Sequence, residues 1–365
     1  MSEKKDSVFS KIYRLYTDDF KPEEMDNLIK NEAPGVYQFY LDSAKKRNIN
    51  NNKVGRTLFF IRDVFLAFLQ KLSPIRRIIY TILILMFAQA FFLENWFNAT
   101  FAFVILNLLL AFEVADKLTA KSELDVARNI QMNLMPQRSS ENTLYDVCGV
   151  SEPAREVGGD YYDIIPVQEE KDALHLFIGD ISGKGMAAAL YMVQVQALLH
   201  DYLNARLTMK EIMFRLNATL NRILQSRYFL TATLVKLDAQ KTMTYCRGGH
   251  NSLLLYRAAT GVCESLLPKG IALGLKQSTL FEHSLELCET QLESGDIVFL
   301  YTDGVTERYN GHKEEYGEER LKRFITNCAN LSVDEIKVQI TLALDRFADG
   351  FNGHDDQTFI VLKVK

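Results

Sequence analysis

Two long uncharged apolar runs dominate the N-terminal third of this 365-residue chain. Residues 78–93 read IIYTILILMFAQAFFL and residues 99–112 read ATFAFVILNLLLAF, with Glu94 as the one charged residue between them. A helix needs about 20 apolar residues to cross the hydrocarbon of a bilayer, so the runs predict two short spans joined by residues 94–98. A buried helical pair in a soluble protein is the alternative interpretation.

Basic residues flank the pair of apolar runs. Arg76 and Arg77 precede the first run, and Lys117 and Lys121 follow the second. Because cytoplasmic flanks are enriched in Lys and Arg, the pattern predicts a two-helix transmembrane hairpin over residues 78–112, multi-pass in the cell (inner) membrane. Residues 58–77 are expected to form an amphipathic juxtamembrane segment, in which residues 58–69 are either a packing helix or a helix that lies at the membrane surface. Residues 1–57 are predicted to form a cytoplasmic helical region, with helices after Pro22 and over residues 38–47. The rest of the chain, which follows the hairpin, is then cytoplasmic.

A linker helix is predicted over residues 113–136, because this stretch has no Gly or Pro before Pro136 and carries a partial apolar stripe. Its mixed charge and irregular spacing make it a weak coiled coil, and pairing of two chains through this helix, as a possible homodimer, is a hypothesis. From residue 137 to 365 the pattern changes to short apolar runs separated by Gly, which predicts a separate folded domain.

Short strand-like runs occur throughout this C-terminal domain, with few alternations of strand and helix, so an antiparallel α+β fold is expected. The predicted strands cover residues 146–151, 161–167, 174–178, 230–237, 242–247, 252–257, 281–287, 297–301 and 358–364. One of them runs into the sequence LHLFIGDISGKG at residues 174–185, where Gly183 and Gly185 predict a tight turn that presents Asp180 before a helix over residues 186–200.

Four acidic turns punctuate the domain, at Asp160, Asp180, Asp303 and the pair Asp355 and Asp356. Any one alone is ordinary turn chemistry, but four together indicate carboxylates gathered at one end of a sheet, which repel one another and need cations. Oxygen ligands without Cys or His spacing select Mg²⁺ or Mn²⁺ over zinc. Two such ions can activate a water and clamp a phosphoryl group for in-line attack.

Composition excludes other classes. The formal net charge of −4 gives no general attraction to nucleic acid, and no nucleic-acid partner is expected. The five cysteines are scattered and odd in number, which argues against a zinc knuckle or a disulfide framework and fits a reducing compartment.

Five motifs, in this order along the chain, resemble those of the PPM (PP2C-like) metal-dependent serine/threonine phosphatases, and most of all their SpoIIE/RsbU-type bacterial branch. The similarity covers roughly residues 122–365, including a regulatory lead-in helix at ARNIQMNLMP. The motifs are EVGGDYYD from residue 156, GDISGKG from 179, GGHN from 248, YTDGVTE from 301 and GHDDQT from 353.

The resemblance implies a PPM-type two-sheet antiparallel β-sandwich flanked by helices, with two Mn²⁺ or Mg²⁺ ions between the sheets. Asp180 would bridge both ions, Asp303 and Asp355 would hold the second, and Asp160 would hold water of the metal shell. Matched motif by motif, the metal-site residues are Asp160, Asp180, Ile181 (backbone carbonyl), Asp303 and Asp355, with Asp356 as an auxiliary ligand.

Two further residues are candidates for contact with the substrate. Arg155 lies five residues before Asp160, the spacing of a phosphate-binding arginine in eukaryotic relatives, and a guanidinium suits a phosphate; a solvated surface charge is the alternative. His250 in GGHN is a candidate general acid for the leaving oxygen or a structural histidine of a Gly loop. Lys184 is expected to be an exposed charge.

The expected function is a membrane-anchored, metal-dependent protein serine/threonine phosphatase. It would hydrolyse phosphoserine or phosphothreonine on a regulatory protein of the anti-sigma-factor-antagonist type, the substrate class that the resemblance implies. The alternative is a non-catalytic membrane receptor or scaffold that retains the phosphatase fold. A phosphodiesterase is less favoured, because no sequence feature resembles a nucleotide-base pocket.

Overall fold

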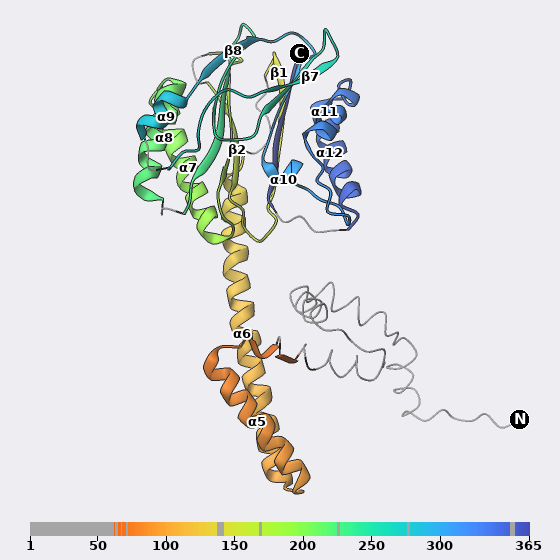
Figure 1. Cartoon of the computed structure of the whole chain (residues 1–365). Coiled ribbons are helices and arrows are strands. Elements are labelled where there is room, and N and C mark those ends of the chain that lie inside the picture. The colour runs from red at the N-terminus through yellow and green to blue at the C-terminus, as the bar shows by residue number, and fades with distance from the viewer. Residues whose placement is uncertain are drawn as a thin grey trace, which may run out of the picture. The chain divides into compact units, whose positions relative to one another are not determined.

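The computed structural model (Figure 1) describes residues 62, 65, 66, 68–70, 72–136, 142–167, 170–224, 227–275, 278–350 and 355–365. The chain divides into two compact units, Met1–Ala120 and Lys121–Lys365. The helices predicted after Pro22 and over residues 38–47 lie outside the described residues.

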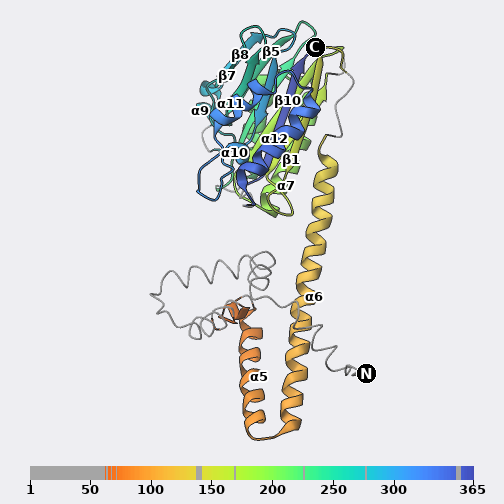
Figure 2. The same cartoon turned by 90° about the vertical axis from the view of Figure 1, so that its right-hand side faces the viewer.

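The first unit contains a helical hairpin. Helix α5 (Pro74–Phe92) is followed by helix α6 (Trp96–Leu134), whose C-terminal end belongs to the second unit. Arg76 at the start of α5 makes ion pairs with Glu113 at 2.8 Å and Asp116 at 2.6 Å. Since the first turn of α5 contacts residues well along α6, the two helices run antiparallel, as Figure 2 shows.

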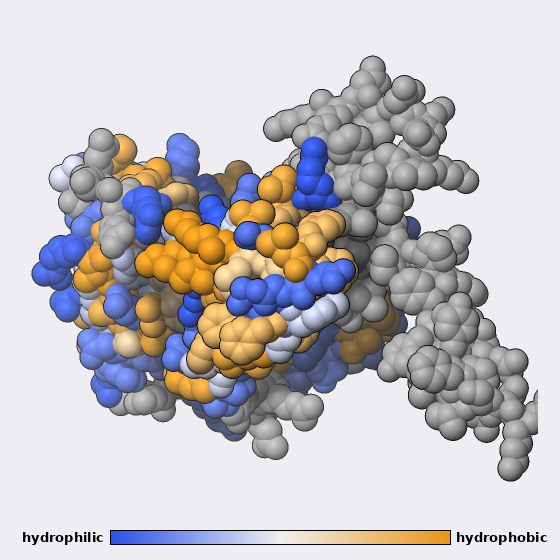
Figure 3. All heavy atoms as spheres, turned by 90° about the horizontal axis from the view of Figure 1, so that it is seen from below, coloured by the Kyte–Doolittle hydropathy of each residue, from blue (hydrophilic) through white to orange (hydrophobic). Residues whose placement is uncertain are grey.

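Both helices are long and apolar enough to cross a membrane by length and composition, a test that core helices of soluble proteins also pass. Polar side chains within them donate to carbonyls one turn back, as Thr81, Thr100 and Asn107 do at 2.8 Å. Large apolar side chains cover the outside of the hairpin, and the view from below (Figure 3) shows many hydrophobic residues on the nearest surface. The most exposed are Phe92, Phe97, Ile75, Leu93, Trp96 and Leu85.

The second unit is built on two antiparallel sheets of five strands each. The first sheet has the order β1 (Tyr145–Glu152), β10 (Gln357–Val364), β9 (Ile297–Tyr301), β6 (Leu253–Arg257) and β7 (Val262–Leu266). The second has the order β2 (Asp160–Pro166), β3 (Leu174–Ile181), β4 (Leu230–Leu237), β5 (Thr242–Gly248) and β8 (Leu287–Gln291). These sheets confirm the expected antiparallel α+β fold.

Helices cover the two outer faces of the sheets (Figure 1). On the second sheet lie α7 (Met186–Asn204), α8 (Met209–Ile223) and α9 (Ser278–Ser284), and on the first lie α11 (Glu318–Asn327) and α12 (Val333–Ala348). The short α10 (Asp303–Thr306) follows β9 after the single residue Thr302.

Strand alternation divides the apolar side chains between two cores, because successive residues of a strand point to opposite faces. Along β9, Val298 and Leu300 join the larger core together with both sheets, α7 and α8. Phe299 and Tyr301 point the other way and join a second core with α11 and α12.

One predicted strand is wrong. Residues 281–287 were expected to be extended, but α9 covers Ser278–Ser284 and the strand β8 begins only at Leu287. The short apolar spacing of this segment fits both structures, and Phe281 is buried against α8, where Phe214 lies 6.2 Å from it between ring centroids. Burial of the Phe281 side chain on one face of this short helix favours the helical structure.

Candidate metal centre

The acidic turns meet at one end of the two sheets because of how the strands pair. Asp160 begins β2 and lies opposite Asp180, near the end of β3, in the antiparallel register. In the other sheet Tyr301 at the end of β9 lies opposite Phe359 near the start of β10. Asp303 lies two residues after the end of β9 and Asp355 two residues before the start of β10, so the chain turns of both sheets carry acids at the same end.

A cleft of about 300 Å³ opens at this end. Asp180, Asp303 and Asp355 all line it, so the structure brings three of the predicted ligands together. The other lining residues are Ser182, Gly183, Lys184, Phe229, Thr231, Gly249, His250 and Asn251.

Asp160 is buried and does not line the cleft. The Thr302 hydroxyl donates to Asp160 Oδ2 at 2.7 Å and accepts from the Thr358 backbone N–H at 3.1 Å. Thr302 therefore connects the acid of one sheet to the strand end of the other. The sequence analysis did not identify this residue, although it directly precedes Asp303 in the YTDG motif.

The electrostatics of these acids show that the carboxylates repel one another. Burial, followed by the charges of Asp303, Asp355 and Asp356, raises the pKa of Asp180 to about 7. Burial and the charge of Asp180 also raise the pKa of Asp160 well above its ordinary value. Carboxylates in such an environment favour a bound cation, because a nearby positive charge restores their ionised form.

The turn after β3 has the shape expected from its glycines. Gly183 and Gly185 have φ values of 97° and 82°, in the region that side chains with a Cβ rarely adopt. The Ile181 backbone N–H donates to the Gly159 carbonyl at 3.3 Å. The Ile181 carbonyl oxygen lies so close to Gly159 that a Cβ there would be 2.8 Å away, so this oxygen sits beside the loop that carries Asp160.

Asp356 has a different environment from the other acids. Its two carboxylate oxygens accept hydrogen bonds from the backbone N–H groups of Ala154 at 2.8 Å and Gly159 at 2.7 Å. Gly304 approaches the Asp356 carbonyl so closely that a Cβ would lie 2.0 Å from its oxygen. Asp356 thus fastens the loop over residues 153–159 to the start of β10, which fits a neighbouring role better than that of a principal ligand.

Lys184, expected to be only exposed, lies 2.8 Å from Asp355 Oδ2. In the described residues, no three His, Cys, Asp or Glu side chains surround one point closely enough to hold a metal ion. The donors are nevertheless all oxygens on buried or half-buried acids, the set that hard divalent cations prefer. The residues therefore fit a Mg²⁺ or Mn²⁺ site whose carboxylates are gathered but not closed around an ion.

His250 is buried and lines the cleft, and its Nδ1 lies 2.9 Å from the Thr231 hydroxyl. Burial lowers its pKa to about 3, so the ring is neutral at physiological pH. A neutral imidazole holds Thr231 in place but is a poor general acid, which favours the structural interpretation. Arg155 is exposed in the loop before β2 and does not line the cleft.

Gln131 is a second residue that the sequence analysis missed. This buried side chain of α6 donates from Nε2 to the Gly158 carbonyl at 2.7 Å and accepts from the Gly158 N–H at 3.1 Å. Gly158 lies two residues before Asp160, so the C-terminal end of α6 holds the loop that carries this acid. Only its place in the IQMNLMP segment distinguished Gln131 in the sequence.

Two five-strand antiparallel sheets with helices outside and acids gathered between their ends define the PPM, or PP2C-like, class of phosphatase domain. The family model described as Stage II sporulation protein E (SpoIIE) matches residues 170–365, more than half of the chain. The chain therefore belongs to the SpoIIE family of PP2C-like phosphoserine phosphatases, and this class depends on metal ions.

Curated relatives agree with this placement. The phosphoserine phosphatase RsbU of Bacillus subtilis is 28% identical over 248 residues, which cover 67% of this chain and 71% of RsbU. Protein IcfG of Synechocystis is 28% identical over 286 residues, which cover 70% of this chain but 44% of IcfG.

Solved structures share the fold. The PP2C domain of SiaA from Pseudomonas aeruginosa has a TM-score of 0.59 at 21% identity and covers 69% of this chain and 99% of that domain. The SpoIIE phosphatase domain with a fragment of its regulatory domain, from Bacillus subtilis, has a TM-score of 0.53 at 19% identity, covering 62% and 64%.

Proposed function

We propose that this chain is a membrane-anchored, metal-dependent protein phosphatase that hydrolyses phosphoserine or phosphothreonine on a regulatory protein of the anti-sigma-factor-antagonist type. One observation carries the proposal: Asp180, Asp303 and Asp355 line one cleft, directly beside the buried Asp160. Family membership supports the phosphoserine chemistry.

Two Mn²⁺ or Mg²⁺ ions are proposed as cofactors. Asp180 would be shared between them, the Ile181 carbonyl would serve one, and Asp303 and Asp355 would serve the other. Asp160, held by Thr302, would orient water, and Asp356 would be an auxiliary ligand. When bound, such ions neutralise the phosphoryl charge and activate a water for in-line attack on phosphorus.

The chain's own residues would prepare the site for a phosphate ester. Lys184 lies at the cleft beside Asp355 and offers a positive charge to an incoming phosphate. Arg155 would contact phosphate only after a change in the exposed loop that carries it. The neutral His250 would shape the cleft wall through Thr231, which leaves the leaving oxygen to take its proton from water.

Membrane anchoring is proposed through the hairpin of α5 and α6. Its support is the length and apolar character of the two helices and the exposed large side chains on their outside. Arg76 and its partners Glu113 and Asp116 draw the two open ends of the hairpin together, so both flanks would lie on the same, cytoplasmic side. Resistance of the full chain to extraction by alkaline carbonate, with release by detergent, is the expected result.

Regulation through a homodimer is proposed for the linker helix over residues 113–136. The contact between Gln131 and Gly158 supports a regulatory role for this helix, because a displacement of this part of α6 would move the loop before Asp160.

Turnover and metal binding together test the catalytic proposal. We expect the detergent-solubilised full chain to release phosphate from a phosphoserine peptide only with Mn²⁺ or Mg²⁺, and Asp180→Asn to lose turnover and calorimetric Mn²⁺ binding. Asp201→Asn, at an exposed acid of α7, is the matched control and should behave as the wild type. Mn²⁺-dependent turnover that persists in Asp180→Asn would sink the assigned mechanism, and a wild-type chain that binds no metal would favour the scaffold alternative.

A further inference from the structure

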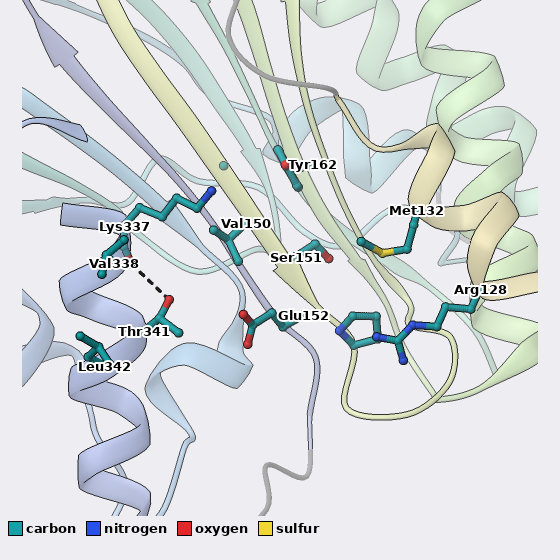
Figure 4. Close-up of a pocket in the computed structure, with 12 residues that line it drawn as sticks. Arg128, Met132, Val150, Ser151, Glu152, Tyr162, Lys337, Val338, Thr341 and Leu342 are labelled. Atoms are coloured by element: carbon teal, nitrogen blue, oxygen red, sulfur yellow. Dashed lines mark hydrogen bonds between the residues drawn. The ribbon is translucent and has the colours of Figure 1, made fainter. Parts of the chain in front are cut away.

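A second cleft of the phosphatase unit, of about 750 Å³, lies along the edge strand β1. Five consecutive residues, 149–153, form its base, while Arg128 and Met132 of α6 lie on one side and Lys337 and Leu342 of α12 on the other (Figure 4). Val338 and Thr341 of α12 and Tyr162 of β2 complete the lining.

The base of this cleft is an open strand edge. Among the described strands, β1 pairs with β10 alone, so its other edge turns backbone N–H and C=O groups toward the cleft. At about 3.3 Å per residue, the five base residues offer about 13 Å of extended backbone. Gly149 has no side chain, and the Tyr162 ring fills that space, since a Cβ at Gly149 would lie 2.2 Å from the ring.

The walls of the cleft expose large apolar side chains, which folded domains normally bury. Val338, Met132 and Leu342 are 53%, 41% and 40% exposed, although they lie around one concave site. Exposed apolar side chains gathered around a cleft are typical of an interaction site. Alternate side chains of an added strand would reach them.

The charge of the cleft indicates the kind of partner. Arg128 and Lys337 outnumber Glu152 in the lining, whereas the whole chain has a net charge of −4. Within the described residues, the Arg128 guanidinium and the Lys337 ammonium make no ion pair or hydrogen bond. Two such cations on opposite walls attract acidic side chains.

The base of the cleft leads into the loop that Asp356 holds beside the gathered acids. Pro153 ends its base, and the next residue, Ala154, donates its N–H to Asp356. A peptide that follows β1 toward this end would therefore bring its next residues to the loop that borders the gathered acids.

We propose that this cleft docks an extended, acidic segment of the phosphoprotein substrate as an added strand beside β1, with the phosphorylated residue lying beyond the segment. The inference rests on the proposed function. Backbone hydrogen bonds would give affinity, the apolar walls would take alternate side chains, and Arg128 and Lys337 would select acidic residues.

Charge reversal in the full chain tests the selectivity. Two phosphoserine peptides have about six flanking residues on each side, which alternate valine with glutamate in one and valine with lysine in the other. In the Arg128→Glu/Lys337→Glu variant, we expect KM for the glutamate peptide to rise about tenfold and KM for the lysine peptide to fall. Turnover of p-nitrophenyl phosphate should stay within about twofold of wild type. The control variant Lys210→Glu, at an exposed lysine of α8, should leave KM for both peptides unchanged.

Backbone pairing needs its own probe, because charge alone does not distinguish a strand from another conformation. Two glutamate peptides are compared, one N-methylated at the odd-numbered amides and the other at the even-numbered amides. In an added strand only one of these two sets of N–H groups points toward β1. Methylation of that set should raise KM severalfold, and methylation of the other set should not.

Equal KM for the two methylated peptides, or a charge reversal that leaves both peptides unchanged, would overturn the docking proposal. A charge reversal that instead changes the oligomeric state, with peptide KM unaltered, would also overturn it and would assign the cleft to a second copy of the chain. Loss of docking with intact p-nitrophenyl phosphate turnover leaves the phosphatase proposal standing. Absence of all metal-dependent turnover in the wild type would instead remove the function on which the inference rests.

Discussion

Asp180 and Glu318 are partly buried carboxylates of the same unit, yet their pKa values move in opposite directions. Burial raises the pKa of Glu318, but hydrogen bonds from Ser265, Ser252, Lys322 and Tyr301 outweigh it and bring the value to about 2. Asp180 has acids as neighbours instead, and its pKa rises to about 7. Hydrogen-bond donors of the fold stabilise ionised Glu318. Ionised Asp180 is destabilised by burial and by neighbouring carboxylates, so this group favours a bound cation. Perturbed groups of the second kind mark functional sites.

The largest expected difference between the two environments is in catalysis. Asp303→Asn should lower kcat/KM for a phosphoserine peptide by about a thousandfold or more, because this acid lines the cleft and is a proposed ligand of the second ion. Glu318→Gln should change it by less than about twofold, which corresponds to under about 0.5 kcal/mol. Steady-state kinetics at saturating Mn²⁺ measure both, and equal losses in the two variants would remove the distinction.

Removal of metal should expose the repulsion among the acids. The folded state favours the protonated form of Asp180 over the ionised form. The contribution of Asp180 to the free energy of unfolding is therefore fully present below its unfolded pKa of about 4 and is lost as pH rises through the folded pKa of about 7. We expect the metal-free unit to be less stable at pH 8 than at pH 5, by about 1–3 kcal/mol, and Mn²⁺ to restore the loss. Urea unfolding at both pH values, with EDTA or Mn²⁺, measures this difference. Asp180→Asn should abolish most of it, and a metal-free wild type that is more stable at pH 8 would contradict the assignment.

Glu318 should show the opposite pH dependence. Its folded pKa lies below the unfolded value of about 4.5, so its contribution is present above that pH and is lost as pH falls toward 2. Glu318→Gln should lower the free energy of unfolding at pH 7 by about 1–2 kcal/mol, because hydrogen bonds from Ser252 and Tyr301 lose a charged acceptor. The destabilisation should shrink in acid, and a variant as stable as wild type at pH 7 would show that these bonds contribute nothing net.

The smallest expected effect concerns Lys184, which pairs with Asp355 at a half-exposed position. A surface ion pair is worth about 0.2–1 kcal/mol, so Lys184→Gln should tighten Mn²⁺ binding by about two- to fivefold by releasing the carboxylate. Calorimetric titration measures the change. Weaker binding in the variant would show that Lys184 supports the ligands and does not compete with the ion.

Much of the fold could be predicted from local patterns. Leu230–Leu237 and Ile297–Tyr301 have the bounds expected from their apolar runs. The helices were underestimated, although α8 and α12 begin with capping boxes, Thr208 with Glu211 and Ser332 with Glu335, that are readable in the sequence. The strand Val262–Leu266 was missed because its burial is slight and its pattern weak.

The residues of the candidate site likewise include some that local sequence predicts and some that it does not. The acids could be found from turns that follow or precede apolar strands, because residue type and local spacing identify them. Thr302, Gln131 and the ion pair of Lys184 could not, because their partners lie far away in the sequence, as Asp160 does from Thr302. The neutral state of His250 likewise depends on burial, which the GGHN motif does not encode.

The position of β10 has a consequence for synthesis. This strand lies between β1 and β9, so the first strand of the unit, Tyr145–Glu152, has no partner until the segment Gln357–Val364 has been made. Asp355 arrives with that same segment. A nascent chain that has emerged as far as β9 therefore exposes an unpaired strand and an incomplete acid cluster for as long as translation of the following residues takes, at about 5–20 residues per second. Completion of the acid cluster and pairing of β1 therefore depend on the same C-terminal segment of the chain.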